Sequence, residues 1–145
     1  MAPLGQGLET RLTELIQSAG YSYELKENEF ALTRVGYANR SVEMTISLIS
    51  LHGVELIEFE SKIAKPTEFE SAALAVYEGN FRCRIVGFSA QEVSEQVGGR
   101  FQVVARSHLY AGYFSDAEFL SMLKLYLIEL DEIDDELKQI VEDGQ

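Results

Sequence analysis

The first part of the chain carries apolar residues at the spacing of one helix face. Four of them lie three or four positions apart: Leu8, Leu12, Leu15 and Ile16. This spacing predicts an amphipathic helix over residues 7–19, which Gly20 ends.

Beyond Tyr23 the apolar period shortens to two, which is typical of strands with one buried face. Phe30 and Leu32 alternate with polar neighbours, and residues 36–39 form a predicted turn. The clearest strand covers residues 41–48. Its apolar positions alternate with Ser, Glu and Thr: Val42, Met44, Ile46 and Leu48. Such alternation indicates an antiparallel sheet with one wet face.

A tight turn at His52 and Gly53 leads into a further apolar–polar alternation over residues 54–60. Because a parallel crossover needs a dozen residues or more, this short connection predicts a β-hairpin.

The middle of the chain predicts one helix and two more strands. Thr67 and Glu70 form a capping-box pattern that should open the helix, and Gly79 should end it. The predicted apolar face of this helix consists of Phe69, Ala72, Ala73, Val76 and Tyr77. A strand should begin with Phe81, Cys83 and Ile85.

The stretch between residues 89 and 99 is ambiguous. Ser89 and Glu92 resemble another capping box, which favours a short helical turn over a strand extension. The alternation over residues 101–105 then predicts the last strand, which runs toward Tyr110.

The last segment predicts a helix as long as the domain is wide. Ser115 and Glu118 form a capping box, and no helix breaker occurs before Gly144. At about 1.5 Å per residue, a helix over residues 115–143 measures roughly 43 Å. Its apolar seam has alternating spacings of four and three and consists of Phe119, Leu123, Tyr126, Leu130, Ile133, Leu137 and Ile140.

The element order is therefore α-β-β-β-α-β-β-α. It predicts an α+β fold with a single antiparallel sheet of about five strands covered by helices. The length of 145 residues favours one domain over the whole chain, residues 1–145. We expect residues 1–6 to be disordered and residues 142–145 to fray.

Apolar residues occupy more of the circumference of the final helix than one sheet face can cover. Three partners could bury the rest: the other helices of the chain, a second copy of the chain, or a different protein. The seam defined above is therefore the candidate protein interface. If it is one, Leu130→Asp should abolish a homodimer and spare the fold.

The excess of acidic residues limits the classes of partner that the chain can bind. Its 12 basic and 24 acidic residues give a formal net charge of -12. Phosphate contacts dominate nucleic-acid affinity, and anionic membranes repel acidic surfaces, so we expect neither nucleic acid nor membrane as a partner. Neither a signal peptide nor an apolar run long enough for a membrane span is visible, which favours the cytoplasm.

Residue types that carry chemistry form no catalytic or cofactor motif. Cys83 is the single cysteine, so it has no disulfide partner within the chain. The acidic run over residues 129–136 lacks the glycine of a calcium-binding loop. His52 and His108 have no triad spacing, and Gly98 belongs to no phosphate-binding loop. We therefore expect no catalytic residue, cofactor or metal.

Two further groups of residues form a secondary candidate patch. Arginines on the last predicted strands, Arg82 and Arg84 among them, should pair with glutamates of the middle strands or bind an acidic partner. Tyr110, Tyr113 and Phe114 lie between the last strand and the final helix. Tyrosines are enriched at interfaces, although these residues could also anchor the helix start.

The element order, the acidity and the stretch over residues 101–106 that leads into the capped final helix resemble the YbjN family of bacterial proteins. This resemblance implies the fold of type III secretion chaperones, and a small cytosolic protein, often dimeric, that binds other proteins. The family has been described as regulators of sensory transduction. It implies no catalytic residues.

Three functions follow as hypotheses. The first is a non-enzymatic protein-binding module, chaperone-like or a regulatory adaptor, acting as a homodimer or on an unknown protein or peptide partner. The second is a small-ligand-binding or enzymatic domain with polar groups converging in a cavity, such as Arg106, His108 and Tyr110. The third is a structural subunit of a larger complex.

Overall fold

A computed structural model describes residues 5–33, 43–93 and 100–143. The described elements are α1 (Gln6–Ser18), β1 (Tyr23–Lys26), β2 (Glu29–Leu32), β3 (Met44–Leu51), β4 (Val54–Thr67), α2 (Phe69–Arg82), β5 (Gly87–Glu92), β6 (Phe101–Tyr110) and α3 (Asp116–Asp143). The strands form one antiparallel sheet in the order β1-β2-β3-β4-β6-β5. The predicted α+β class with a single antiparallel sheet is confirmed.

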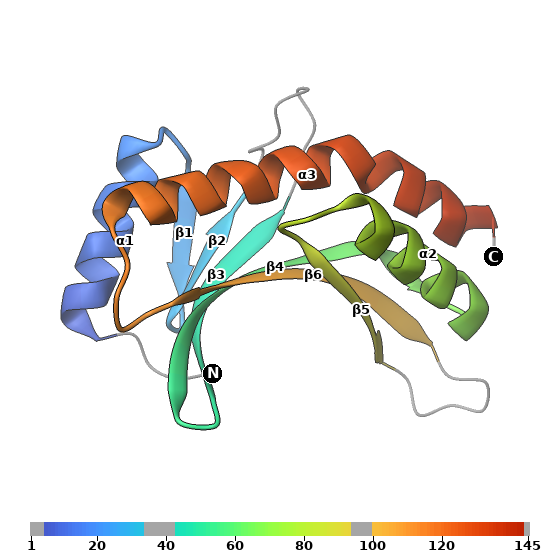
Figure 1. Cartoon of the computed structure of the whole chain (residues 1–145), viewed down its shortest axis with the longest axis horizontal. Coiled ribbons are helices and arrows are strands. Elements are labelled where there is room, and N and C mark those ends of the chain that lie inside the picture. Colours follow the sequence, from blue (N-terminus) through green and yellow to red (C-terminus); the bar gives the residue numbers. More distant parts are fainter. Residues whose placement is uncertain (1–4, 34–42, 94–99, 144–145) are drawn as a thin grey trace.

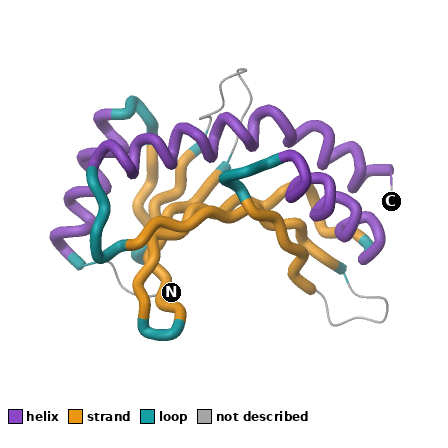
Figure 2. The backbone as a smooth tube through the Cα atoms, viewed as in Figure 1, coloured by secondary structure: helices purple, strands orange, loops and turns teal. Residues whose placement is uncertain are grey.

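The three helices lie on one side of an arched sheet, and α3 spans most of its width (Figures 1 and 2). Alternate strand residues such as Phe30, Ile46 and Phe59 point toward the helices and are buried with them in one core. None of the described helices is both long enough and apolar enough to cross a membrane.

The sheet has six strands where about five were predicted, because a turn at Glu27 and Asn28 divides the second predicted element into β1 and β2. Both turn residues have positive φ, which Asn tolerates well and Glu adopts rarely. The predicted hairpin at His52 and Gly53 is confirmed, with positive φ at both positions. The turn predicted at residues 36–39 lies outside the described residues.

The boundaries around α2 differ from the prediction. Thr67 ends β4 and pairs with Phe101, so it does not cap the helix, which begins after Glu68. A register shift between Ile63 and Thr67 carries the strand past Pro66. The Gln102 side chain supports this bulge by donating a hydrogen bond to the Ile63 carbonyl at 3.0 Å.

The region after α2 also differs. The helix continues through Gly79 to Arg82, so the strand predicted from Phe81 is wrong, and β5 begins only at Gly87. Ser89 and Glu92 lie in this strand, so the predicted helical turn there is wrong for residues 89–92. Residues 94–99 lie outside the described part.

The start of α3 follows the prediction. The backbone N–H of Glu118 donates to Ser115 Oγ at 3.0 Å, so the predicted capping box is formed. Arg11 of α1 also stabilises the N-terminal end of α3. Its guanidinium donates to the Phe114 carbonyl at 2.7 Å and pairs with Asp116 at 3.0 Å.

The two ends of the described chain carry regular structure. Gln6 already belongs to α1, and α3 continues through Glu142 to Asp143. Residues 1–4 and 144–145, where disorder and fraying were predicted, lie outside the described residues.

Candidate functional site

The small residues of α2 face the protein interior. Ala72, Ala75 and Gly79 are buried, and the ring of Phe88 from β5 packs directly on Gly79. A Cβ at position 79 would lie 2.6 Å from the nearest ring carbon, so only glycine allows this approach. Because α2 packs against the core through the side that holds these small residues, large side chains on its other side are exposed to solvent.

Three aromatic residues of α2 are exposed as a consequence. The exposed fractions are 61% for Phe69, 66% for Tyr77 and 75% for Phe81. Together with Ala73 they recur every fourth residue, so they line one side of the helix. The rings of Tyr77 and Phe81 stack with centroids 6.3 Å apart. The buried apolar face predicted for this helix is therefore wrong at Phe69, Ala73 and Tyr77, although Ala72 is buried as predicted.

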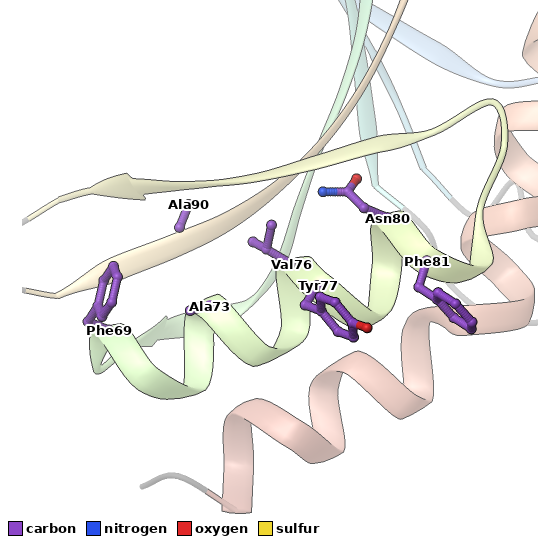
Figure 3. Close-up of a pocket in the computed structure, with 7 residues that line it drawn as sticks. All are labelled: Phe69, Ala73, Val76, Tyr77, Asn80, Phe81 and Ala90. Atoms are coloured by element: carbon purple, nitrogen blue, oxygen red, sulfur yellow. The ribbon is translucent and has the colours of Figure 1, made fainter.

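These side chains line a shallow groove between α2 and β5. It has a volume of about 590 Å³ and is lined by Phe69, Ala73, Val76, Tyr77, Asn80, Phe81 and Ala90. Figure 3 shows the three aromatic rings spread along α2, while Ala90 approaches from β5. The Asn80 amide and the Tyr77 hydroxyl are the only side-chain polar groups of this lining. With no converging polar groups, the groove suits apolar side chains better than bond-making chemistry.

The strand beside the groove is an edge of the sheet. β5 pairs with β6 on one side, and no described strand lies along its other side. Asn80 occupies part of that free side: its amide donates to the Phe88 carbonyl at 3.0 Å and accepts from the Phe88 N–H at 2.7 Å. The side chain thus imitates a neighbouring strand at this residue.

A carboxylate of α3 fixes the loop that leads into β5. Glu129 accepts hydrogen bonds from the backbone N–H groups of Arg84, Ile85 and Val86 at 2.8, 2.8 and 2.9 Å. Within the acidic run over residues 129–136, Glu129 therefore holds tertiary structure. Burial, with a smaller contribution from Glu129, raises the pKa of the neighbouring Cys83 thiol from 9.0 to about 11.

The predicted α3 interface lies mostly in the core of its own chain. The buried members are Phe119, Leu123, Tyr126, Leu130, Ile133 and Leu137, and Ile140 is partly exposed. The curved sheet and the helices α1 and α2 together cover this seam, which the sequence could not show, while Leu125 on the outer side of α3 stays exposed. Tyr126 even places its hydroxyl inside, where it lies 2.9 Å from Ser61 Oγ, and burial raises its pKa. These six residues therefore offer no exposed surface.

The secondary patch does not form one surface. Phe114 is buried against Phe119 under the Arg11 guanidinium, whereas Tyr110 and Tyr113 are exposed. Arg82 lies in α2, not in a strand, and pairs with Glu136 of α3. Arg84 lies in the loop before β5, so the predicted strand face with both arginines is wrong.

The uncovered face of the sheet carries a paired charge cluster. Arg106 Nε lies 2.9 Å from Glu60, and His108 Nε2 lies 2.9 Å from Glu58. Pairing of arginines on the last predicted strands with glutamates of the middle strands was predicted, and it is confirmed for Arg106 with Glu60. These side chains point away from the helices, so Arg106, His108 and Tyr110 do not converge in a cavity between the sheet and the helices.

Sequence reasoning missed the α2–β5 groove for an identifiable reason. In α2 the aromatic residues and the small residues both follow a helical period, so either side could have been the buried one. The available signal was the spacing of Ala72, Ala75 and Gly79, a stripe of small residues that permits close packing. Nothing in the sequence pointed to the role of Asn80.

Comparison with known proteins gives support at the level of the fold. No family model matches the chain, and no curated protein matches it. A solved structure matches with a TM-score of 0.59: YbjN, described as a candidate transcription regulator, from E. coli. The match covers 93% of this chain and 96% of the other at 15% sequence identity. The predicted likeness to YbjN is therefore confirmed for the fold.

Proposed function

We propose that this protein is a non-enzymatic protein-binding module, a regulatory adaptor in the cytoplasm, and that its docking surface is the α2–β5 groove. The observation that carries the proposal is the exposure of Phe69, Tyr77 and Phe81 on one side of α2. Aromatic residues dominate interface energetics because each one buries a large area when a partner covers it.

The size of the surface supports this function. A large aromatic side chain buries on the order of 200 Å². At the observed exposure, the three rings present roughly 400 Å² of apolar surface, and patches of this size on monomers are often functional. The structural neighbour YbjN is described as a regulator, which agrees with a binding role.

The homodimer predicted from the sequence stays a prediction. It relied on the α3 seam, and that surface is buried. A second copy would therefore have to use another face of the molecule.

The groove can be tested by matched affinity capture from a lysate of the source organism. The bait variants are Tyr77→Ser with Phe81→Ser in the groove, and Tyr113→Ser at an 83% exposed aromatic residue outside it. We expect the groove variant to lose the proteins that the unmodified chain and the Tyr113 variant retain. Equal capture by all three baits would contradict the proposal.

A further inference from the structure

We propose that the groove and the free edge of β5 together bind an extended, basic and apolar segment of another protein, which adds as a strand beside Ala90 and Glu92. This inference rests on the proposed function and names the class of partner.

The hydrogen bonds of β5 show which of its backbone groups can receive a strand. Residues of an antiparallel strand alternate, so that one set bonds to each side. The Phe88 backbone bonds to Asn80 on the outer side, and the Val93 N–H bonds inward to the Arg100 carbonyl at 2.8 Å. Ala90 and Glu92 have the same parity as Phe88, so their N–H and C=O groups point outward. Asn80 ends the available edge at Phe88.

The groove is placed to read the side chains of such a strand. The Phe88 ring faces α2, and by the same alternation Ala90 faces α2 as well, where it lines the groove. Alternate side chains of an added strand would likewise point toward α2, where they would meet Phe69 and Ala73 beside Ala90 and then Tyr77 farther along the groove (Figure 3). Strand addition takes affinity from main-chain hydrogen bonds and specificity from pockets for alternate side chains. An extended segment can form the main-chain hydrogen bonds with β5, and large apolar residues at every second position can fill the groove.

Charge indicates the remaining residues of the partner. The helix α2 packs beside the second half of α3 (Figure 1). Residues 69–82 and 130–143 of these helices hold nine acidic residues, of which Asp131 and Asp134 are buried, and two basic ones. Both basic residues already form salt bridges: Arg82 pairs with Glu136, and Lys138 pairs with Asp134. A segment with Lys or Arg beside its apolar residues would complement this acidic surface, with faster association at low salt.

A second copy fits the groove less well. It would bring the same acidic helices against each other, since each chain has a net charge of -12. A stable interface buries about 800 Å² per partner, roughly twice what the three aromatic rings present. Strand addition by a basic segment avoids the repulsion and adds backbone hydrogen bonds to the apolar contact.

The probe is a synthetic eight-residue peptide that alternates Lys with Phe or Val, titrated by fluorescence anisotropy. Two control peptides isolate the two contributions. One replaces every Lys by Glu, and the other carries N-methyl groups on alternate residues, which remove the N–H donors of one edge; both sets of positions are tested. We expect micromolar binding of the probe and at least tenfold weaker binding of the Glu peptide. One N-methylated peptide should lose binding, and the other should retain it.

Protein variants locate the binding. Tyr77→Ser with Phe81→Ser should weaken binding of the Lys peptide at least tenfold, and Tyr113→Ser should leave it unchanged. Ala90→Pro removes one outward N–H, which the β5–β6 ladder does not use, so the fold should persist with binding at least fivefold weaker. Far-ultraviolet circular dichroism checks the fold of each variant, and amide shifts of Ala90 and Glu92 report the edge directly.

The outcomes separate the two proposals. Binding that ignores the groove variant would be nonspecific attraction to an acidic protein and would overturn this inference. Binding that depends on the groove but is unaffected by both N-methylated peptides, with unshifted Ala90 and Glu92 amides, would exclude strand addition. A dimer that Phe81→Ser dissociates would make a second copy the occupant. In the last two cases the groove remains a protein-binding site, whereas the proposed function fails only if affinity capture is also independent of the groove.

Discussion

Glu129 on α3 accepts a hydrogen bond from the Val86 backbone at 2.9 Å, across 43 residues of sequence. The same carboxylate holds the N–H groups of Arg84 and Ile85. It thereby ties the loop between α2 and β5 to the longest helix and sets the position of the groove's edge strand. The site therefore depends on a residue that does not line it.

Glu129→Ala should destabilise the protein by about 2 kcal/mol, because three N–H groups in a partly buried loop lose their acceptor. Urea unfolding followed by circular dichroism measures this change. Glu132→Ala, an exposed acid one turn along the same helix, is the control and should change stability little. Equal effects of the two substitutions would show that the carboxylate clamp carries no stability.

Gly79→Ala should destabilise the fold by about 1–3 kcal/mol, the usual range for overpacking. The added methyl group would lie 2.6 Å from the Phe88 ring, so α2 and β5 would have to separate. Gly7→Ala is the matched control, since a Cβ there meets nothing within 4 Å in α1. A thermal melt of each variant decides the point. An unchanged melting temperature for Gly79→Ala would mean that the two elements pack more loosely than the structure indicates.

Leu130→Asp should unfold or severely destabilise the protein, by several kcal/mol, because Leu130 is only 1% exposed and its replacement would bury a charge. The sequence alone had suggested that this change would spare the fold. Leu125→Asp makes the same substitution at a 44% exposed position of the same helix and should be tolerated. Denaturant midpoints compare the two variants. A folded, cooperative Leu130→Asp protein would contradict the burial of the seam.

Cys83 should react slowly with iodoacetamide in the folded protein. Its pKa is raised from 9.0 to about 11, so at pH 8 the thiolate fraction is about 100-fold lower than in the unfolded chain. A rate at pH 8 equal to that in guanidinium chloride would contradict this pKa.

The raised pKa of Cys83 also makes the free energy of unfolding depend on pH. A raised folded-state pKa contributes stability that is complete below pH 9 and is lost as the pH rises through 11. Cys83→Ser should therefore flatten the loss of stability between pH 9 and pH 11, measured by urea unfolding at each pH. A slope that is identical in both proteins would assign the loss to other groups.

The sequence by itself determined the elements whose signals are local. The capping hydrogen bond at Ser115, the hairpin at His52 and Gly53, and the alternation of β3 and β6 each depend on residues close in sequence, and each was predicted. Local signals failed where partners are distant. Thr67 looked like a helix cap, yet it belongs to a strand because Phe101 pairs with it.

Tertiary structure alone decided which apolar residues became surface. The sequence predicted an apolar face on α2 and, on α3, an apolar surface wider than one sheet face could cover. The arch of the sheet and the packing of α1 and α2 buried the α3 seam, while the contact between Gly79 and Phe88 turned the aromatic side of α2 outward. The hydrophobic effect favours the burial of any apolar surface and does not select one helix face over another. The buried face is the one that packs closely against its neighbours, and those neighbours are known only from the folded structure.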